Sequence, residues 1–444
     1  MAENFSERNL KLYIGSTEEA QLKSTLKKIK SHTLVNHVIE SCNAIKPVSF
    51  TNADVILQGY VNVRSDCLAG DYWAADDSVV QDYCTISYQQ MFKHWIINDV
   101  VENGLKAVPR CYEKMFLCLL NFFRNKQYHQ KAIANYKKSK GDESGLSAVL
   151  AEHYFSLLIP DRSYLVDENA SRKHDKCPCK VSTCKKRIKI GNTAIGSSLV
   201  WHGYADIFLD QKLPVTILSG ELGDIDAEFE NDYQPVPKKM KIDKDVASSI
   251  DASENVGEHS SGRPVASTSN KAKNETDMVE LCVEVKNKVS DDVLLSLNVI
   301  DQIIAETITN AFVQVTTNHC LKGRMIPTFG CSQEHVVVFL YDPEHDILLQ
   351  GSDLIKLFEI PEHLSEKAAV EVWLFLNFST FFHPNLAQKF KFKKSRFHSC
   401  VKKYISLYKK ATYKQRFAPA DTNFFAEVAM PEILKEAKPV EENI

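Results

Sequence analysis

Three residues in the middle of the chain carry side chains that together suit phosphodiester hydrolysis: Asp206, Glu284 and Lys286. Glu284 and Lys286 lie two residues apart in the apolar run from Met278 to Lys286, which we expect to be a β-strand, so both side chains point to one face of a sheet. If Asp206 lies on a neighbouring strand, the two carboxylates offer the hard oxygen ligands that Mg²⁺, or Mn²⁺ in its place, prefers. The metal would polarise the phosphoryl oxygen and lower the pKa of an attacking water, which Lys286 helps to orient.

The elements that must position these side chains can be predicted from the spacing of apolar residues. In chain order we expect a helix over 146–158, strands over 199–209 and 214–218, a strand over 278–286, and a long amphipathic helix that opens with Ser290 as its N-cap. The strand over 199–209 contains Asp206, and the long helix contains Gln302. The helix over 146–158 has an apolar stripe that includes His153, and it leaves Glu152 on another face.

This order resembles the PD-(D/E)XK nuclease superfamily, which includes restriction enzymes, Holliday-junction resolvases and lambda-exonuclease-like proteins. The resemblance covers about residues 145–345. Asp206, in His-Gly-Tyr-Ala-Asp-Ile-Phe-Leu, matches the first acidic residue of the family, and Glu284-Val285-Lys286 matches its E-x-K motif. Gln302 matches a glutamine that exonuclease-like branches carry on the next helix, and Glu152 is the candidate for a glutamate on the first helix.

The resemblance implies a Mg²⁺-dependent nuclease, with DNA as the expected substrate. Asp206 and Glu284 would be metal ligands, Lys286 would position the water, and Gln302 would lie near the scissile phosphate. The chain departs from the family pattern in lacking a Pro before Asp206 and in the long gap between Asp206 and Glu284. The alternative, from another class, is a catalytically inactive nuclease-fold protein, derived from a mobile element, that binds nucleic acid or another protein.

The gap between Asp206 and Glu284 is explained by residues 224–277, which are rich in Asp, Glu, Ser, Asn, Lys and Pro. Such a composition cannot bury enough apolar surface to offset its chain entropy, so we expect a disordered insertion within one domain. Loop-closure entropy grows slowly with length, so the flanking strands can still be neighbours. Within the insertion, the basic cluster of Lys238, Lys239 and Lys241 would be accessible to a nuclear import receptor.

We therefore expect an α/β fold, with a restriction-endonuclease-like mixed central sheet flanked by helices. We expect the chain to be organised in three regions. They are a helical N-terminal region over 1–140, the nuclease-like core over 141–345, and a basic helical C-terminal region over 346–444. The N-terminal region is interpreted as helical from the spacing of Leu22, Leu26, Ile29 and His32 and from a dense apolar run over 112–123.

A second group of residues, His174, Cys177, Cys179 and Cys184, has the composition of a metal site. Thiolates and an imidazole suit Zn²⁺, and cysteines near the nuclease core hold an iron–sulfur cluster in some exonuclease-like relatives. The spacing matches neither a standard zinc ribbon nor a ferredoxin motif, so reduced thiols in a loop are the alternative.

The run from Lys389 to Phe417 holds eleven Lys or Arg, no acidic residue and several aromatic residues. Such a segment can bind phosphates and stack on bases, or it can be an amphipathic helix with buried aromatics and solvated lysines. The whole chain of 444 residues has a formal net charge of only -3, so any attraction to nucleic acid must come from such local clusters. With no signal peptide and no apolar run of bilayer length, we expect an intracellular protein, nuclear or cytoplasmic, with no membrane partner.

Overall fold

The structure is a computed structural model of the whole chain. It describes residues 10–29, 31–58, 60–64, 71–75, 83–138, 142–169, 175–209, 213–218, 296–360, 362–384 and 386–414. Several features expected from the sequence lie outside the described residues, namely the strand with Glu284 and Lys286, the insertion over 224–277 with its basic cluster, and His174. The long helix begins at Leu297 with Ser296 as its N-cap, so the expectation that it opens with Ser290 is wrong.

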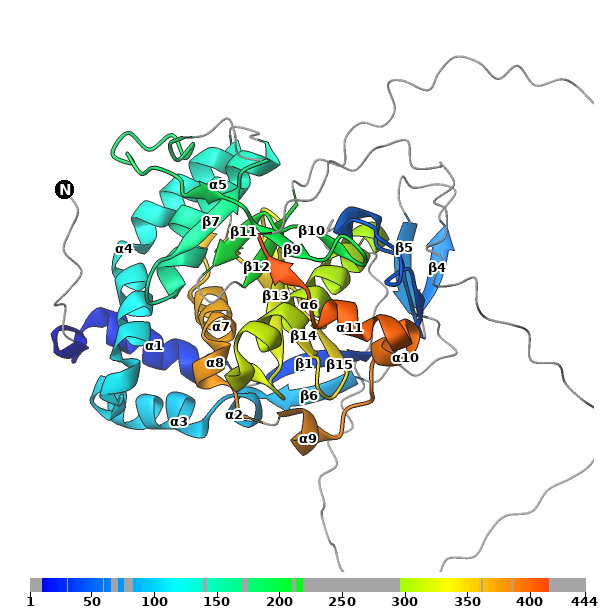
Figure 1. Cartoon of the computed structure of the whole chain (residues 1–444). Helices are drawn as coiled ribbons and strands as arrows, with labels where there is room; N and C mark the ends of the chain where they lie inside the picture. Colours follow the sequence, from blue (N-terminus) through cyan, green and yellow to red (C-terminus); the bar gives the residue numbers. More distant parts are fainter. Residues whose placement is uncertain are drawn as a thin grey trace, which may run out of the picture. The chain divides into compact units, whose positions relative to one another are not determined.

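A ten-stranded mixed sheet is the largest element of the fold (Figure 1). Its strand order is β6-β1-β15-β14-β13-β12-β11-β7-β8, and β16 pairs with β14 beside this path. The strands are β1 (Ser31–His37), β6 (Tyr83–Ser87), β7 (Tyr164–Asp167), β8 (Ile190–Gly191), β11 (Ile207–Leu209), β12 (Pro214–Ile217), β13 (Ile326–Cys331), β14 (His335–Asp342), β15 (Ile347–Gly351) and β16 (Ile355–Lys356). Most pairs are antiparallel, whereas β12 with β13 and β7 with β8 are parallel.

Strands β7, β11 and β12 form an antiparallel set in the middle of the sequence, in register through Ile207 with Val166 on one side and Val215 on the other. The chain then passes through the long helix α6 (Leu297–Thr317) before it returns as β13, parallel to β12. A parallel neighbour requires such a crossover, because the chain must travel back to the start of the next strand. Because these strands are antiparallel, the end of β7, the start of β11 and the end of β12 lie next to one another at the same ends of the strands.

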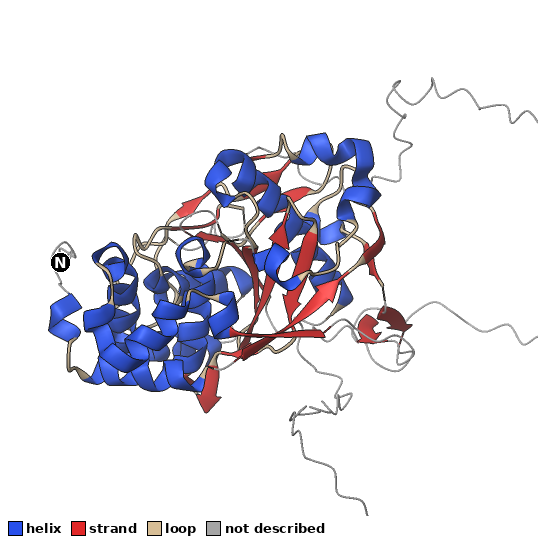
Figure 2. Cartoon of the chain, turned by 90° about the horizontal axis from the view of Figure 1, so that it is seen from below, coloured by secondary structure: helices blue, strands red, loops and turns tan. Residues whose placement is uncertain are grey.

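Helices lie on both sides of the sheet (Figure 2). Helix α6 contacts β13, β14 and β12, and its apolar residues Ile300, Ile304, Ile308 and Phe312 are buried as the sequence predicts. The other long helices contact one another and the strands next to them. They are α1 (Thr17–Lys28), α3 (His94–Asn103), α4 (Glu113–Lys138), α5 (Glu143–His153) and α7 (Glu366–Leu376), with the short α2 (Tyr88–Met91) and α8 (Phe378–Phe381) at their ends.

Four smaller sheets complete the described strands. They are β10 (His202–Tyr204) with β9 (Ala194–Gly196) and β19 (Thr412–Tyr413); β2 (Ile39–Cys42) with β3 (Val55–Leu57); β4 (Tyr60–Arg64) with β5 (Asp71–Ala75); and β17 (Phe358–Ile360) with β18 (His363–Leu364). The expected strand over 199–209 is thus two strands, β10 and β11, that belong to different sheets and meet at Ala205 and Asp206.

The N-terminal region is helical only in part. Leu22 and Leu26 are buried on α1, but the helix ends at Lys28, and His32 lies in β1. Strands β1 to β6 occupy residues 31–87, and β1 and β6 belong to the large sheet, so the expectation of a helical region over 1–140 is wrong for this stretch. The structure confirms a mixed α/β fold with helices around a large sheet.

The C-terminal region is also less helical than the sequence predicts. A continuous helix over 397–412 is replaced by α10 (Phe397–Val401), a 3₁₀ turn, α11 (Ile405–Tyr408) and the strand β19, preceded by α9 (Leu386–Phe390). Within the described residues, no helix is both long enough and apolar enough to cross a bilayer.

Candidate functional site

Asp206 directly precedes β11, at the place in the sheet where β7 and β12 end and β11 begins. Its backbone carbonyl accepts a hydrogen bond of 3.0 Å from the backbone N–H of Asp167, the last residue of β7. Its carboxylate oxygen Oδ2 accepts a hydrogen bond of 2.8 Å from the backbone N–H of Ile217, the last residue of β12. The side chain of Asp206 is therefore held in place by the strands that surround it.

Helix α6 brings a second carboxylate, Glu306, to the same strand. Thr216, the neighbour of Ile217 in β12, donates its hydroxyl to Glu306 Oε2 at 2.5 Å. Gln302, one helical turn before Glu306, donates its side-chain amide to Glu306 Oε1 at 3.0 Å. Glu306 is fully buried, so these two bonds satisfy a carboxylate that has no access to water.

The electrostatics of this group oppose the ionised state of its acids. Burial raises the pKa of Asp206 well above its ordinary value; the hydrogen bond from Ile217 acts against that rise, and the charges of Glu143, Glu306 and Asp167 add to it. Burial raises the pKa of Glu306 to about 7, although the hydrogen bonds from Thr216 and Gln302 lower it. Because the negative charges of these carboxylates repel one another, a divalent cation bound nearby would stabilise their ionised forms.

Glu152 does not join this group of acids. It accepts a hydrogen bond of 2.8 Å from the hydroxyl of Tyr164 and lies 4.0 Å from Lys186 Nζ. Glu143, at the other end of α5, is the residue of that helix whose charge acts on Asp206. Glu143 and Glu152 are nine positions apart, which corresponds to about 13 Å along a helix. Glu143, rather than Glu152, is therefore the acid of α5 whose charge raises the pKa of Asp206.

The structure links Asp206 to Gln302 by a series of hydrogen bonds. Asp206 accepts from Ile217, the neighbouring Thr216 donates to Glu306, and Gln302 also donates to Glu306. Glu284 and Lys286 lie outside the described residues, between β12 and α6 in the chain. The sequence interpretation missed Glu306, although its spacing of four residues from Gln302 on an amphipathic helix is a signal that both share one face.

A second cluster consists of His153, Cys177, Cys179 and Cys184. One ligand atom from each residue lies within 4.8 Å of every other, and three of the four residues are buried. Ligands of a tetrahedral zinc ion lie about 3.5–3.8 Å apart, given metal–ligand distances of about 2.0–2.3 Å. The cluster could hold a metal ion with only a small contraction.

Local structure of the loop between β7 and β8 explains how three cysteines converge. The N–H of Cys177 donates to the carbonyl of Lys186 at 2.9 Å, and Lys176 pairs with Arg187, so the two sides of the loop run antiparallel. Lys180, directly after Cys179, has a positive φ of 57°, which turns the backbone sharply.

His153 enters this cluster from the last position of α5. Its Nε2 lies 3.5 Å from Cys184 Sγ, and its Nδ1 lies 3.1 Å from Nδ1 of His129 on α4. A metal-binding histidine usually forms a hydrogen bond through its second ring nitrogen, which fixes the tautomer and the ring orientation. His129 is placed to serve in that way.

The protonation of the cluster reflects the close approach of its donors. Burial lowers the pKa of His153, but hydrogen bonds and charges of Cys179 and Cys184 raise it, to about 9 overall. For Cys179, the largest cause is the hydrogen bond from Cys177, which lowers the pKa. Burial raises the pKa, but the Cys177 and His153 interactions outweigh burial and lower the pKa of Cys179 to about 4. A thiolate beside an imidazolium is an arrangement that a metal ion can replace by displacing the proton.

The fourth member of the cluster differs from the sequence prediction. His174 lies outside the described residues, and His153, more than twenty residues away from the nearest cysteine in sequence, lies with the three cysteines instead. His153 lies on the buried stripe of its helix, as the apolar pattern predicts. Nine cysteines among the described residues form no disulfide.

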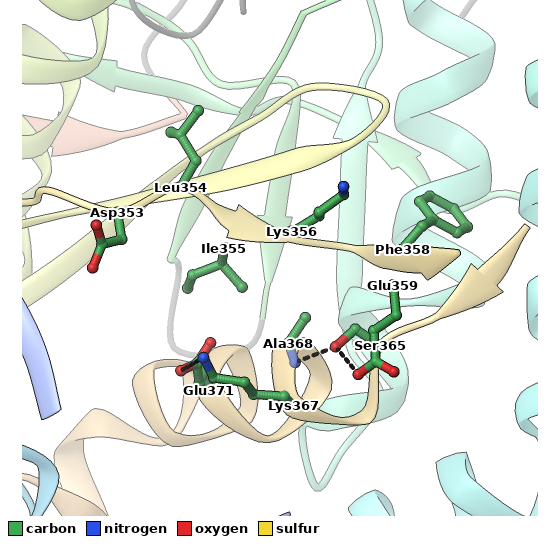
Figure 3. A pocket seen from close by; sticks show the side chains of 10 residues that line it. All are labelled: Asp353, Leu354, Ile355, Lys356, Phe358, Glu359, Ser365, Lys367, Ala368 and Glu371. Carbon is green, nitrogen blue, oxygen red and sulfur yellow. Dashed lines mark hydrogen bonds and ion pairs between the residues drawn. The ribbon is translucent and has the colours of Figure 1, made fainter. Parts of the chain in front are cut away.

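A surface pocket of about 240 Å³ lies between β16, β17 and the start of α7 (Figure 3). Ser365 caps α7 by accepting from the N–H of Ala368 and donates its hydroxyl to Glu359, while Lys367 lies 3.8 Å from Glu371. None of the residues predicted to be functional lines the pocket. The contacts in it stabilise the start of a helix, and we assign it no chemistry.

Comparison of the chain with protein-family models, with curated proteins and with solved structures gives no match.

Proposed function

We propose that the chain is a metal-dependent nuclease that hydrolyses phosphodiester bonds in nucleic acid, with DNA as the expected substrate. The observation that carries this proposal is the position of Asp206, which is held by the end of β12 and is influenced by the charges of Glu306, Glu143 and Asp167. The chain that follows β12 contains Glu284-Val285-Lys286, the motif expected to complete such a site. The order of a helix (α5), strands (β11 and β12) and a long helix (α6) along the chain around Asp206 supports the proposal.

In this proposal Asp206 and Glu284 would hold Mg²⁺ or Mn²⁺, which supplies phosphoryl polarisation and a more acidic water when bound. Lys286 orients the water. Gln302 has a positioning role in addition to its expected place near the phosphate, because its amide holds Glu306 together with Thr216. Glu306, with a pKa of about 7, can accept or release a proton near neutral pH.

The test is a cleavage assay of the purified full chain on labelled single-stranded DNA, duplex DNA and RNA, with Mg²⁺ or with chelator. Asp206→Asn keeps an acceptor for Ile217 and removes the charge, and we expect it to lower the cleavage rate at least about a hundredfold. Lys286→Ala should have a similar effect. The control, Glu344→Gln, changes an exposed acid that pairs with Lys322 at 3.2 Å and should cleave like the wild type.

Cleavage that persists in Asp206→Asn, or that is unaffected by chelator, would show that Asp206 is not a ligand of the catalytic metal. Binding of nucleic acid with no cleavage by the wild type would instead favour the inactive, nucleic-acid-binding alternative.

We further propose that His153, Cys177, Cys179 and Cys184 bind a single structural Zn²⁺. All four ligand atoms lie within 4.8 Å of one another, which leaves room for one ion, whereas an iron–sulfur cluster needs its ligands spread around several irons. The set is closed, with four protein ligands and no position for substrate, as in structural zinc sites. The ion would tie α5 to the loop between β7 and β8.

Elemental analysis of the purified chain should find about one zinc per molecule and no stoichiometric iron. Cys179→Ser should lose most of the zinc, and Cys118→Ser, which changes a buried cysteine that donates to the Ile159 carbonyl at 3.3 Å, should keep it. Equal zinc content in the two variants would contradict the assignment.

A further inference from the structure

We propose that the exposed basic residues of the C-terminal segment over 396–414 bind the phosphate backbone of nucleic acid and present it to the site around Asp206. The cations concerned are Arg396, Lys402, Lys403, Lys409, Lys410 and Lys414. Their role in presenting substrate rests on the proposed function, whereas the binding itself can be measured without it.

The segment is held against the molecule by its aromatic residues. Phe397 and Tyr408 are fully buried and pack against Phe312 of α6, with ring centroids 6.2 Å and 5.7 Å away. Tyr408 also donates its hydroxyl to the carbonyl of Ala44 at 2.8 Å. These aromatics therefore belong to the core rather than to a base-stacking surface, and they leave the cations on a fixed scaffold.

The segment runs along α6 towards the residues around Asp206. The hydroxyl of Thr316 donates to the carbonyl of Lys409 at 3.1 Å, and the hydroxyl of Tyr413 donates to Asn310 at 3.0 Å. Asn310 lies one helical turn from Glu306, on the face of α6 that also carries Gln302. The described part of the segment ends there, beside α6 and β9 (Figure 1).

Lys414 lies close to the strand that leads into Asp206. Its N–H donates to the carbonyl of Ala194 in β9 at 2.9 Å, and Ala194 pairs on the other side with Tyr204, two residues before Asp206. Two strand spacings correspond to about 10 Å. A phosphate backbone that contacts Lys414 thus lies within a few nucleotides of the candidate active site.

The cations of the segment have no acidic partners. All six are exposed, none of them forms an ion pair with a described carboxylate, and the segment itself contains no Asp or Glu. By contrast, exposed lysines elsewhere in the described chain, such as Lys138 and Lys322, are paired with glutamates. Unneutralised cations in a row attract a polyanion, because binding releases the counterions of its phosphates.

Backbone strain is concentrated on these cations. Eight non-glycine residues in the described chain have positive φ, and three of them are Arg396, Lys402 and Lys414, with φ of 65°, 38° and 63°. Strained conformations of this kind persist where the surrounding packing fixes them, and they occur at binding sites. Here the packing of Phe397 and Tyr408 fixes a backbone that turns its charged side chains outward.

The test compares Lys403→Glu/Lys409→Glu/Lys410→Glu with a control of equal charge change, Lys27→Glu/Lys114→Glu/Lys131→Glu. The three control lysines are exposed on α1 and α4 and have no ion-pair partner among the described residues. Both triple variants are made in the full chain that also carries Asp206→Asn, which is expected to prevent cleavage during the measurement. The parent for comparison is the chain with Asp206→Asn alone. Fluorescence anisotropy then measures the affinity for labelled single-stranded DNA, duplex DNA and RNA of one sequence, from about 50 to 200 mM salt.

We expect the C-terminal triple variant to lower the affinity at least about tenfold and to reduce the salt dependence by about 0.9 in slope for each phosphate that the protein no longer neutralises. The control should bind within about twofold of the parent. If the triple variant unfolds, the corresponding Gln variants replace both sets. The inference would be overturned if both triple variants lowered the affinity equally or if the parent bound no nucleic acid. It would also be overturned if polyglutamate displaced the labelled nucleic acid as well as unlabelled nucleic acid does. Loss of binding in the C-terminal variant, alongside a wild type that never cleaves, would refute the nuclease and leave this binding surface standing.

Discussion

Asp301 is a buried acid that precedes Gln302 on α6. It is 7% exposed, and its Oδ1 has no hydrogen-bond partner among the described residues. Burial raises its pKa to about 7; a hydrogen bond from the Val55 backbone lowers it, and the charge of Asp54 raises it. The folded protein therefore favours the neutral acid at a pH where the unfolded chain has already lost the proton.

This difference predicts how stability varies with pH. Because the folded pKa lies above the ordinary value of 3.8, the contribution of Asp301 is fully present below about pH 4 and is lost as the pH rises to about 7, with a slope of up to about 1.4 kcal/mol per pH unit. Asp301→Asn removes the ionisable group, so the variant should not lose this stability as the pH rises. Its free energy of unfolding minus that of the wild type should therefore be larger at about pH 8 than at about pH 4. Urea unfolding at both pH values measures this change.

The control for this experiment is Asp161→Asn, at an exposed position. Its free energy of unfolding should follow the wild type at both pH values. A difference between wild type and Asp301→Asn that does not vary with pH would mean that the buried acid does not titrate as described.

Individual ligands are the hardest residues to predict from sequence. Asp206 and Gln302 could be named as candidates because each lies in a segment predicted from its apolar pattern. The structure connects them through β12 and Glu306, and their roles stay predictions. His153 could not be named, because its helical spacing is that of a core residue and nothing near it in sequence points to three cysteines. His174 is predicted as the fourth ligand because it is close to the three cysteines in sequence. The ligands of a metal site need to be close only in the folded chain.

Among the elements, the turn between β9 and β10 positions the strand that leads into Asp206. Gly196 has a φ of +108°, and a Cβ there would lie 2.5 Å from the carbonyl oxygen of Trp201 and 2.9 Å from His202 Cα. Both atoms belong to the backbone of the turn, so they cannot move aside as a flexible side chain would.

Gly196→Ala should therefore lower the free energy of unfolding by about 3 kcal/mol or more, the sum of an unfavourable φ and a backbone clash. Gly15→Ala is the matched control, because Gly15 also has a positive φ, +78°, but a Cβ there would meet no atom within 4 Å. It should cost only about 1–2 kcal/mol. Equal losses in chemical denaturation would show that φ alone matters at Gly196.

Elements with a local signal are the ones that sequence predicts well. Strand β12 lies where the apolar pattern places it, and helices α4 and α6 contain the apolar residues from which they are predicted. The strands over 31–87 are missed, since their partners are distant: β1 pairs with β15. The C-terminal segment fails for another reason. Phe397 and Tyr408 pack against each other with ring centroids 5.1 Å apart, which a continuous helix would not allow at eleven residues' separation, and the chain between them forms short turns.

At the scale of the whole molecule, the large sheet does not respect the regions expected from the sequence. Strands β1 and β6 come from the N-terminal region, while β15 lies beyond residue 345, where the nuclease-like core was expected to end. A boundary there would also separate β14 from β15, which pair through Asp342 and Ile347. Charge and periodicity mark changes in composition along the chain, but they do not show which strands share a sheet.

The pairing of β1 with β15 has a consequence for biosynthesis. Leu34 pairs with Gly351, so a ribosome must add about 300 residues after β1 before its partner exists. Until then β6 is the only neighbour of β1 in the sheet that has been synthesised, and a ribbon of these two strands would have an open edge, the kind of surface that associates with other chains. We expect this ribbon to be a chaperone-binding segment in the nascent protein, and the sheet to close only after translation has passed β15.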